Sequence, residues 1–205
     1  MFKNQKLTLV AAAIILILIA SCSKSKSGPS TQGPLGGNWN FVSLHMQTQA
    51  TIQATIPGPA GPETDKTVTN SNYTTIKNAG VIVFTADSMV ATGLTYTIAD
   101  SLYAYNYING IFTDSSHSPF TGGFPPINNS SAYKLIGTDS LYFPGGGSLA
   151  GLSGSQATVA SGAKFVINGN TMTITGQINQ TSSPVIQGIT ASEVETGAYT
   201  ITLQK

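Results

Sequence analysis

The sequence predicts an all-β protein: a single antiparallel β-barrel of about 8–10 strands, with a β-sandwich as the alternative. Three observations predict this class. Apolar and polar residues alternate with a period of two over most of residues 38–205, as they do in half-buried antiparallel strands. Only 8% of the chain is charged, and the other polar positions hold many threonines, which suit exposed strand faces. No part of residues 38–205 keeps a helical period.

Residues 1–21 have the order of a bacterial export signal. Lys3 and Lys6 precede an unbroken apolar run from Leu7 to Ala20. A helix that spans a membrane needs about 20 apolar residues, and this run is shorter. A cleaved signal peptide is therefore the better interpretation.

Cys22 is the only cysteine of the chain, and small residues precede it. Ile19-Ala20-Ser21-Cys22 resembles the lipobox of bacterial lipoproteins. The resemblance implies cleavage before Cys22, a diacylglycerol thioether at its thiol and three acyl chains in all. The mature protein would then stay on its membrane, because two chains already anchor stably. The alternative is an ordinary signal peptide followed by a free cysteine. The rest of residues 22–37 is rich in Ser, Gly and Pro and is expected to be a flexible tether of about 20 Å.

The residues after Cys22 favour an outer-membrane anchor with the domain, residues 38–205, facing the periplasm rather than the cell surface. An aspartate directly after the cysteine would resemble an inner-membrane retention signal, but this chain has Ser23 there. Lys24 and Lys26 differ from the acidic cluster that marks many surface-exported lipoproteins.

The charge balance excludes a nucleic-acid partner. From Cys22 onward the chain has seven lysines, eight acidic residues and no arginine, a net charge of −1. A nucleic-acid binder needs clustered Lys and Arg to replace condensed counterions, and no such cluster is visible. With one thiol, the chain has no internal disulfide.

The first expected strand contains a change of phase. Trp39 and Phe41 share one parity, whereas Val42, Leu44 and Met46 share the other, so a bulge or bend is expected where the phase changes. The alternation then runs on until PGPAGP, residues 57–62. A strand of this length is expected to break or to curl within a closed sheet.

Further strands are expected at residues 67–77, within 80–110, at 164–176 and at 198–205. The clearest hairpin is KFVINGNTMTITG, with a type I′ turn at Asn168-Gly169 and with Met172 and Ile174 facing inward. Two stretches without alternation, residues 115–131 and 144–163, are expected to be long loops.

Four of the five aspartates are followed by serine, at positions 87, 100, 114 and 139. Aspartate bonds to the backbone of its own turn, so each pair predicts a tight turn between strands. Three of the pairs precede Met or Leu and resemble the acceptor site of bacterial O-glycosylation systems. That resemblance makes Ser88, Ser101 and Ser140 candidate modification sites.

A group of aromatic residues gives the candidate ligand site. Tyr103, Tyr105 and Tyr107 share one face of an expected strand, and Tyr96 lies earlier in the same segment. Such residues line apolar pockets or stack on sugars. The alternative is that they pack in the core or across strands.

No catalytic or metal signature is present, so we expect a binding protein that is not an enzyme and needs no cofactor. Gly151-Leu-Ser-Gly-Ser155 fails the Gly-x-Ser-x-Gly pattern at its last position. His45 and His117 have no recognisable partner motif, and two histidines make a poor metal set.

Gly37-Asn38-Trp39, which opens the first strand just after the tether, resembles the start of bacterial lipocalin-like lipoproteins. Thr138-Asp139-Ser-Leu-Tyr142 is similar to a second lipocalin motif. The resemblance implies a closed barrel plugged by the indole of Trp39 and a small apolar ligand, such as a lipid, inside it. The chain departs from the family because it has no arginine to pack across the tryptophan and because it ends on an expected strand. The second hypothesis is a surface β-sandwich lipoprotein that binds glycans or proteins through its long loops.

Overall fold

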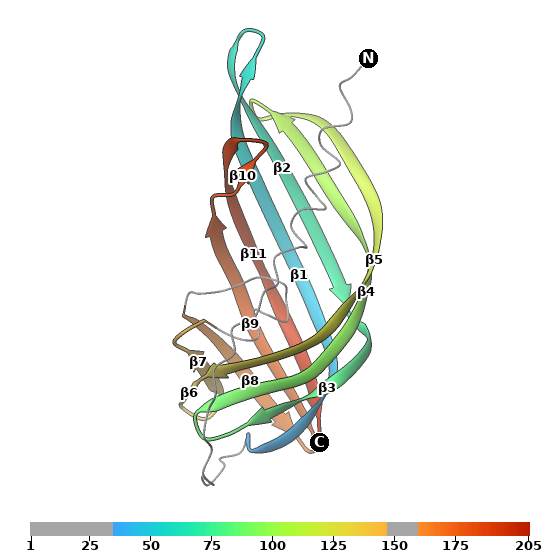
Figure 1. Cartoon of the computed structure of the whole chain (residues 1–205), viewed down its shortest axis with the longest axis vertical. Coiled ribbons are helices and arrows are strands. Elements are labelled where there is room, and N and C mark those ends of the chain that lie inside the picture. The colour runs from blue at the N-terminus through green and yellow to red at the C-terminus, as the bar shows by residue number, and fades with distance from the viewer. Residues whose placement is uncertain (1–34, 147–159) are drawn as a thin grey trace. The chain divides into compact units, whose positions relative to one another are not determined.

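The computed structural model describes residues 35–146 and 160–205 (Figure 1). These residues form one antiparallel sheet and no helix, which confirms the all-β prediction. No helix in this part of the chain has the length and hydrophobicity that a membrane crossing requires. The expected signal peptide and Cys22 lie outside the described residues.

The described residues contain eleven strands, several of them longer than 20 residues. They are β1 (Gly37–Gly58), β2 (Gly61–Thr74), β3 (Ile76–Phe84), β4 (Ser88–Ile108), β5 (Ile111–Ala132), β6 (Lys134–Ile136), β7 (Ser140–Phe143), β8 (Ser161–Asn168), β9 (Thr171–Ser182), β10 (Val185–Ile186) and β11 (Ile189–Gln204).

The strands follow a meander in which β2 and β3 share one position. β1 pairs with β11 on one side; on the other it pairs with β2 beyond residue 45 and with β3 over residues 37–40. β4 pairs with β2 and β3 in turn, and β5 pairs with β4. On the far side of β11 the order continues through β9, β8, β7 and β6.

The two ends of this strand order, β5 and β6, are consecutive in the chain and are joined by Tyr133 alone. The Tyr133 side chain is buried and its hydroxyl donates to the Thr85 carbonyl at 2.6 Å. Its ring makes an edge contact with Phe84 at a centroid distance of 5.8 Å. The buried, hydrogen-bonded side chain of Tyr133 therefore fixes the point where the chain passes from β5 to β6.

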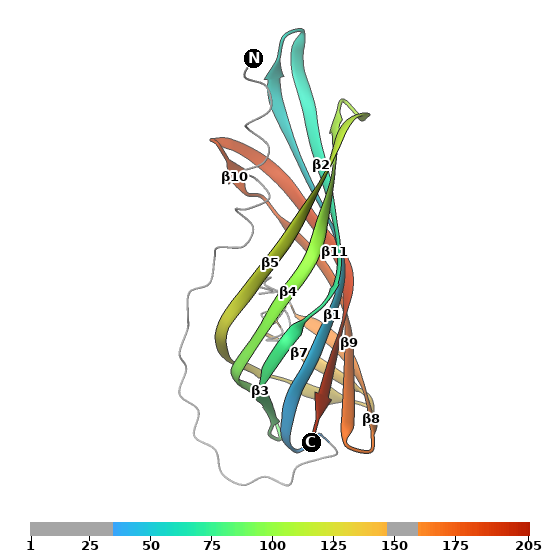
Figure 2. The ribbon, with the colours of Figure 1, turned by 90° about the vertical axis from the view of Figure 1, so that its right-hand side faces the viewer.

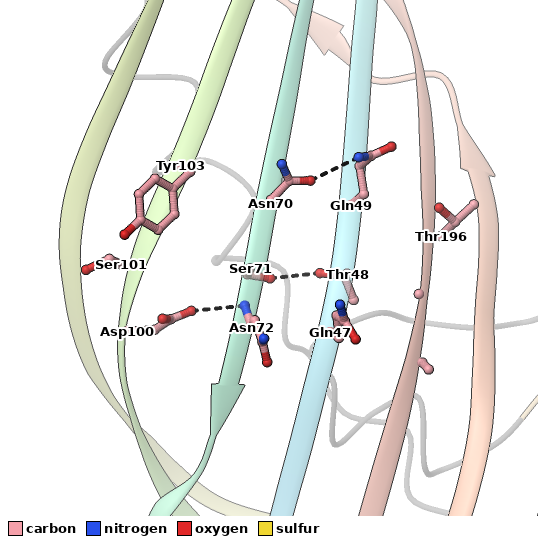
Figure 3. A pocket seen from close by; sticks show the side chains of 12 residues that line it. Gln47, Thr48, Gln49, Asn70, Ser71, Asn72, Asp100, Ser101, Tyr103 and Thr196 are labelled. Carbon is pink, nitrogen blue, oxygen red and sulfur yellow. Dashed lines mark hydrogen bonds between the residues drawn. The ribbon is translucent and has the colours of Figure 1, made fainter.

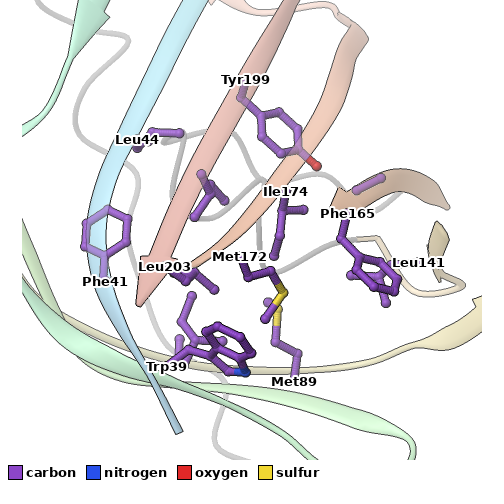
Figure 4. Packing of buried hydrophobic residues seen from close by; sticks show 14 of the residues in the cluster. Trp39, Phe41, Leu44, Met89, Leu141, Phe165, Met172, Ile174, Tyr199 and Leu203 are labelled. Atoms are coloured by element: carbon purple, nitrogen blue, oxygen red, sulfur yellow. The ribbon is translucent and has the colours of Figure 1, made fainter. Parts of the chain in front are cut away.

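Large side chains are buried on one face of the sheet, which we call the inner face, and mainly toward the end where β1 starts (Figure 4). Trp39 is fully buried, and its indole N–H donates to the Leu35 carbonyl at 2.8 Å. The ammonium of Lys205 lies 4.5 Å from the centre of the indole ring, within cation–π range. The cluster around it includes Phe41, Leu44, Met89, Leu141, Phe165, Met172, Ile174, Ile201 and Leu203. Leu35 is buried too, so the folded part begins before residue 38 and includes the end of the expected tether.

The other half of the sheet, the distal half, has almost no core. Its long strands extend away from the core cluster (Figure 2). The distal half comprises residues 47–58 of β1, 61–72 of β2, 99–108 of β4, 111–121 of β5 and 189–197 of β11. Within it Ala191 is the one buried hydrophobic side chain. On β1 and β11 the inner-face side chains of this half are half-buried, whereas those of the opposite face are mostly exposed.

The bulge predicted from the change of phase in β1 is confirmed. The β1–β11 register shifts between Phe41 and Ser43, and Val42 is the extra residue. A second irregularity separates β2 from β3, where Thr75 is buried. Its hydroxyl accepts the Leu44 N–H at 2.9 Å, and its own N–H donates to the Leu44 carbonyl.

The prediction of a loop at residues 115–131 is wrong, because these residues belong to β5 and pair with β4 almost throughout. No residue of β5 is fully buried, and only Phe120, Phe124 and Ile127 pack against the core, so most of the strand lacks the alternation that burial selects. Its prolines, Pro119, Pro125 and Pro126, are tolerated at the edge of a sheet, where no N–H is needed.

The type I′ turn predicted at Asn168-Gly169 is also misplaced. Asn168 pairs with Thr171, so Gly169-Asn170 is the loop, and only Gly169 has a positive φ. That pattern fits a type II′ turn. Met172 and Ile174 are buried, as expected. Positive φ angles at both central positions, the mark of type I′, occur instead at Asn109-Gly110 and Gln187-Gly188.

Candidate functional site

A polar groove of about 540 Å³ lies in the distal half, between β4, β2, β1 and β11 (Figure 3). Gln49 of β1 pairs with Asn70 of β2 and with Thr196 of β11, and Asn70 pairs with Tyr103 of β4. Residues that pair directly point to the same face, so these four side chains form one row across four strands. We call this face, opposite the core, the outer face.

A second row lies one step toward the core. Gln47 pairs with Asn72 and with Ala198. Ser101 has the same parity on β4 as Tyr103 and also lines the groove. The outer-face rows thus bring together four amide side chains, two hydroxyl side chains and one tyrosine.

The groove coincides with an interruption in the β2–β4 ladder. The described pairs between β4 and β2 end at Tyr103 and Asn70. Pairing of β4 resumes with β3, at Thr97 and Ile76. In the interval the carboxylate of Asp100 accepts the Asn72 backbone N–H at 3.4 Å. The two strands are therefore held apart, and backbone polar groups border the groove as well as side chains.

The amides of the first row are oriented by a hydrogen bond. Gln49 Nε2 donates to Asn70 Oδ1 at 3.0 Å, which leaves Gln49 Oε1 and Asn70 Nδ2 available. The Tyr103 ring packs against the His117 imidazole at a centroid distance of 4.8 Å and remains 46% exposed. The row can accept and donate hydrogen bonds beside an exposed aromatic face.

The four predicted ligand-site tyrosines do not lie together. Tyr103, Tyr105 and Tyr107 share the outer face, but Tyr96 points to the inner face and is buried. β4 runs without a bulge from Tyr96 to Tyr105, and an odd sequence separation in one strand reverses the side chain. No single pocket can be lined by all four.

The amide residues of the groove were missed in the sequence, although a signal exists. Gln47-Thr-Gln49 and Asn70-Ser-Asn72 both place amides at every second position. The pairing of β1 with β2 sets the two runs side by side. Only the hairpin register, which the turn at residues 59–60 determines, brings them together.

The candidate modification sites differ in their surroundings. Ser88 and Ser140 lie at turns, where Ser88 Oγ is 2.7 Å from Thr85 Oγ1 and Ser140 Oγ donates to Asp139 at 2.9 Å. Ser101 lies within β4. The predicted turns at Asp100 and Asp114 are therefore wrong, since both aspartates lie within long strands that gain more from continuous pairing.

On the inner face, acidic and phenolic groups lie above the core. Burial, followed by the charge of Glu193, raises the pKa of Glu195 above its ordinary value of 4.5. Burial raises the pKa of Tyr199 and of Tyr96 to about 12. Burial also raises the pKa of Tyr73, with smaller contributions from Tyr96, Glu195 and Asp100.

No group of three or more His, Cys, Asp or Glu residues in the described ranges is placed to hold a metal ion. His45 Nδ1 lies 3.0 Å from Thr74 Oγ1, and His117 is engaged with Tyr103. His45 lies on β1 and His117 on β5, and each side chain contacts a residue of a neighbouring strand.

Compared with models of known protein families and with curated proteins, the chain matches none.

Replacing Glu195 by Gln should stabilise the domain at neutral pH and have little effect near pH 4. The raised pKa means that the folded state binds a proton more readily than the unfolded state. Stability therefore falls as the pH rises from 4.5 through the raised value, and the amide removes that loss. Urea unfolding of both proteins at pH 4 and pH 7 measures the difference. Asp114→Asn, on exposed β5, controls for the loss of one negative charge; an equal gain in both variants would contradict the assignment.

Proposed function

We propose that this chain is a lipid-anchored protein of the bacterial cell envelope whose β domain binds an uncharged glycan in the outer-face groove. The observation that carries the proposal is the row of Gln49, Asn70, Tyr103 and Thr196, with its oriented amides and exposed ring. The role proposed is binding, without catalysis.

The chemistry of the groove fits a sugar better than an apolar molecule. Sugar hydroxyls both donate and accept, as amide side chains do, and the C–H face of a sugar ring packs on an aromatic ring. Asp100 is the one charged side chain among the groove residues, so an anionic polymer has no counter-charge here. The interrupted ladder adds backbone donors and acceptors at the same place.

For the fold we propose a lipocalin-like barrel that is closed where β5 passes into β6 at Tyr133. In support, those strands end the strand order and are adjacent in the chain. Lys205 also covers Trp39, at the place where the family resemblance leads us to expect an arginine. In a sandwich, by contrast, β5 and β6 would belong to the edges of separate sheets.

For the location we propose an outer-membrane anchor through Cys22, with the domain facing the periplasm rather than the cell surface. The support is the order of charged end, apolar run, small residues and cysteine in residues 1–22, and the lysines at 24 and 26. A glycan of the envelope would then be within reach of the anchored domain.

Replacing Cys22 by Ser should move the protein from the membrane fraction to the soluble periplasmic fraction. The serine cannot form the thioether that carries the diacylglycerol, so the mature chain would lose its anchor. Fractionation of cells and the mass of the mature N-terminal peptide measure this. Retention of Cys22→Ser in the membrane fraction together with an unmodified wild-type Cys22 would overturn the anchor.

Replacing Tyr103 by Ala should weaken binding of the recognised glycan several-fold, up to about 10-fold, because packing on an aromatic ring contributes about 0.5–1.5 kcal/mol. Screening of envelope and plant oligosaccharides followed by calorimetry measures the affinity. Tyr142→Ala is the matched control, since Tyr142 is 39% exposed against 46% for Tyr103 and lies in β7, away from the groove. Equal losses in both variants, or no glycan bound by wild type, would count against the groove.

A small apolar ligand on the inner face is the second candidate, favoured by one observation. Above the core, the inner face of β1 carries the half-buried Ala50, Ile52 and Ala54. The rings of Tyr73 and Tyr199 lie beside Met46 at the base of this row. If the ligand binds on the inner face, Tyr96 lines its site, whereas Tyr103, Tyr105 and Tyr107 do not.

If the apolar candidate holds, native mass spectrometry of the mature chain with Cys22→Ser should show an additional mass that solvent extraction removes. Ala50→Glu should abolish that mass, because it adds a charge to the apolar row. Gln49→Glu, which adds the same charge to the outer face, should not. If neither the unaltered domain nor Gln49→Glu carries an additional mass, glycan binding in the groove remains the supported function.

A further inference from the structure

We propose that three apolar hairpin turns at the distal end of the sheet form a surface that docks on a neutral lipid bilayer. The turns join β1 to β2, β4 to β5 and β10 to β11 (Figure 1). Together they are called the distal tips: residues 56–62, 107–113 and 184–190.

The tips lie together at the end of the sheet opposite Gly37. Asn109 donates its N–H to the Thr64 carbonyl, and its side-chain oxygen accepts the Thr64 N–H, both at 2.9 Å. These bonds hold the β4–β5 turn against β2. On the other side the β1–β11 pairing ends at Ala54 and Ala191, and the turn at Gln187-Gly188 lies beyond that pair at the same end of the sheet.

Large apolar side chains are exposed at these turns, where polar residues are the norm. Ile111 is 71% exposed and Val185 is 67% exposed, and Phe112 is also largely exposed. The turn of the first tip is built from Pro57, Gly58, Pro59, Ala60, Gly61 and Pro62. These side chains bury little in the fold, and each would gain free energy by leaving water.

The arrangement fits a bilayer better than a protein surface. The apolar groups stand on three separate points instead of one flat patch, and a fluid medium can accept separate points. Behind Ile108 and Phe112 comes Tyr107, whose ring contacts Phe112 at 5.8 Å and carries the Lys66 ammonium at 4.6 Å. Tyrosine and lysine with apolar stems and polar ends occupy the headgroup level of membranes.

The charges near the tips select neutral headgroups. The three tip segments contain no charged residue. Glu63 and Asp114 adjoin the first two tips, Asp65 pairs with Ile108 of the second tip, and Glu193 lies three residues after the third. Lys66 is the single lysine nearby. A net negative collar disfavours anionic lipids, so we expect binding driven by apolar burial and insensitive to salt.

Vesicle co-sedimentation of the mature chain with Cys22→Ser tests the proposal without a contribution from the anchor. We expect binding to phosphatidylcholine vesicles, unchanged between 50 and 500 mM salt, and weaker binding to vesicles rich in phosphatidylglycerol. The double variant Ile111→Ser, Val185→Ser should lose at least 10-fold in partition, with an unchanged unfolding midpoint because both side chains are exposed.

The matched control is Ile136→Ser, Val166→Ser, which removes an isoleucine 54% exposed and a valine 66% exposed at the opposite end of the sheet. It should bind vesicles as wild type does. Equal loss in the two double variants, or no binding by wild type, would overturn the proposal. A concentration-dependent dimer that the tip variant abolishes, without vesicle binding, would assign the tips to a second copy of this chain instead.

Discussion

Burial of the inner-face side chains around Trp39 is the constraint on which the whole sheet depends. The large buried residues of β1, β3, β4, β7, β8, β9 and β11 meet there. Hairpins of two strands are only marginally stable in water, because hydrogen bonding alone gives little net free energy. The distal half persists because β1, β4 and β11 enter it directly from the core. β1 stays paired with β11 from Ser43 to Ala54, and β4 stays paired with β5 from Tyr96 to Asn106.

A half-sheet without a covering layer has a chemical consequence. Its outer face has to satisfy water, and amides and hydroxyls do so without charge. The same groups, once aligned by pairing, become an ordered array of donors and acceptors such as Gln49, Asn70 and Thr196. Solubility and recognition thus use the same side chains, and the interruption beside Asp100 localises recognition to one stretch of the face.

The sequence reveals the fold where burial selects residues and fails where it does not. The spacing of Trp39, Phe41 and Leu44 reveals the bulge, because each of these side chains must face the core. β5 carries little of such a record, since only Phe120, Phe124 and Ile127 pack against the core and none of its residues is fully buried. The separation of Tyr96 from Tyr103 follows from parity, but only once Asp100-Ser101 is known to continue the strand, and turn preference alone predicts the opposite. The groove depends on hairpin register, which single residues do not report.

The distal tips pose the inverse problem. Fully burying an aliphatic or aromatic side chain gains about 1.5–3 kcal/mol, and the fold obtains almost none of this from Ile111, Phe112 or Val185. The neighbouring turns would form equally well with polar residues, because Asn109-Gly110 and Gln187-Gly188 already supply the required positive φ angles. Local structure therefore gives no reason for these apolar residues. Their burial in a bilayer, outside the fold of the chain itself, does give one.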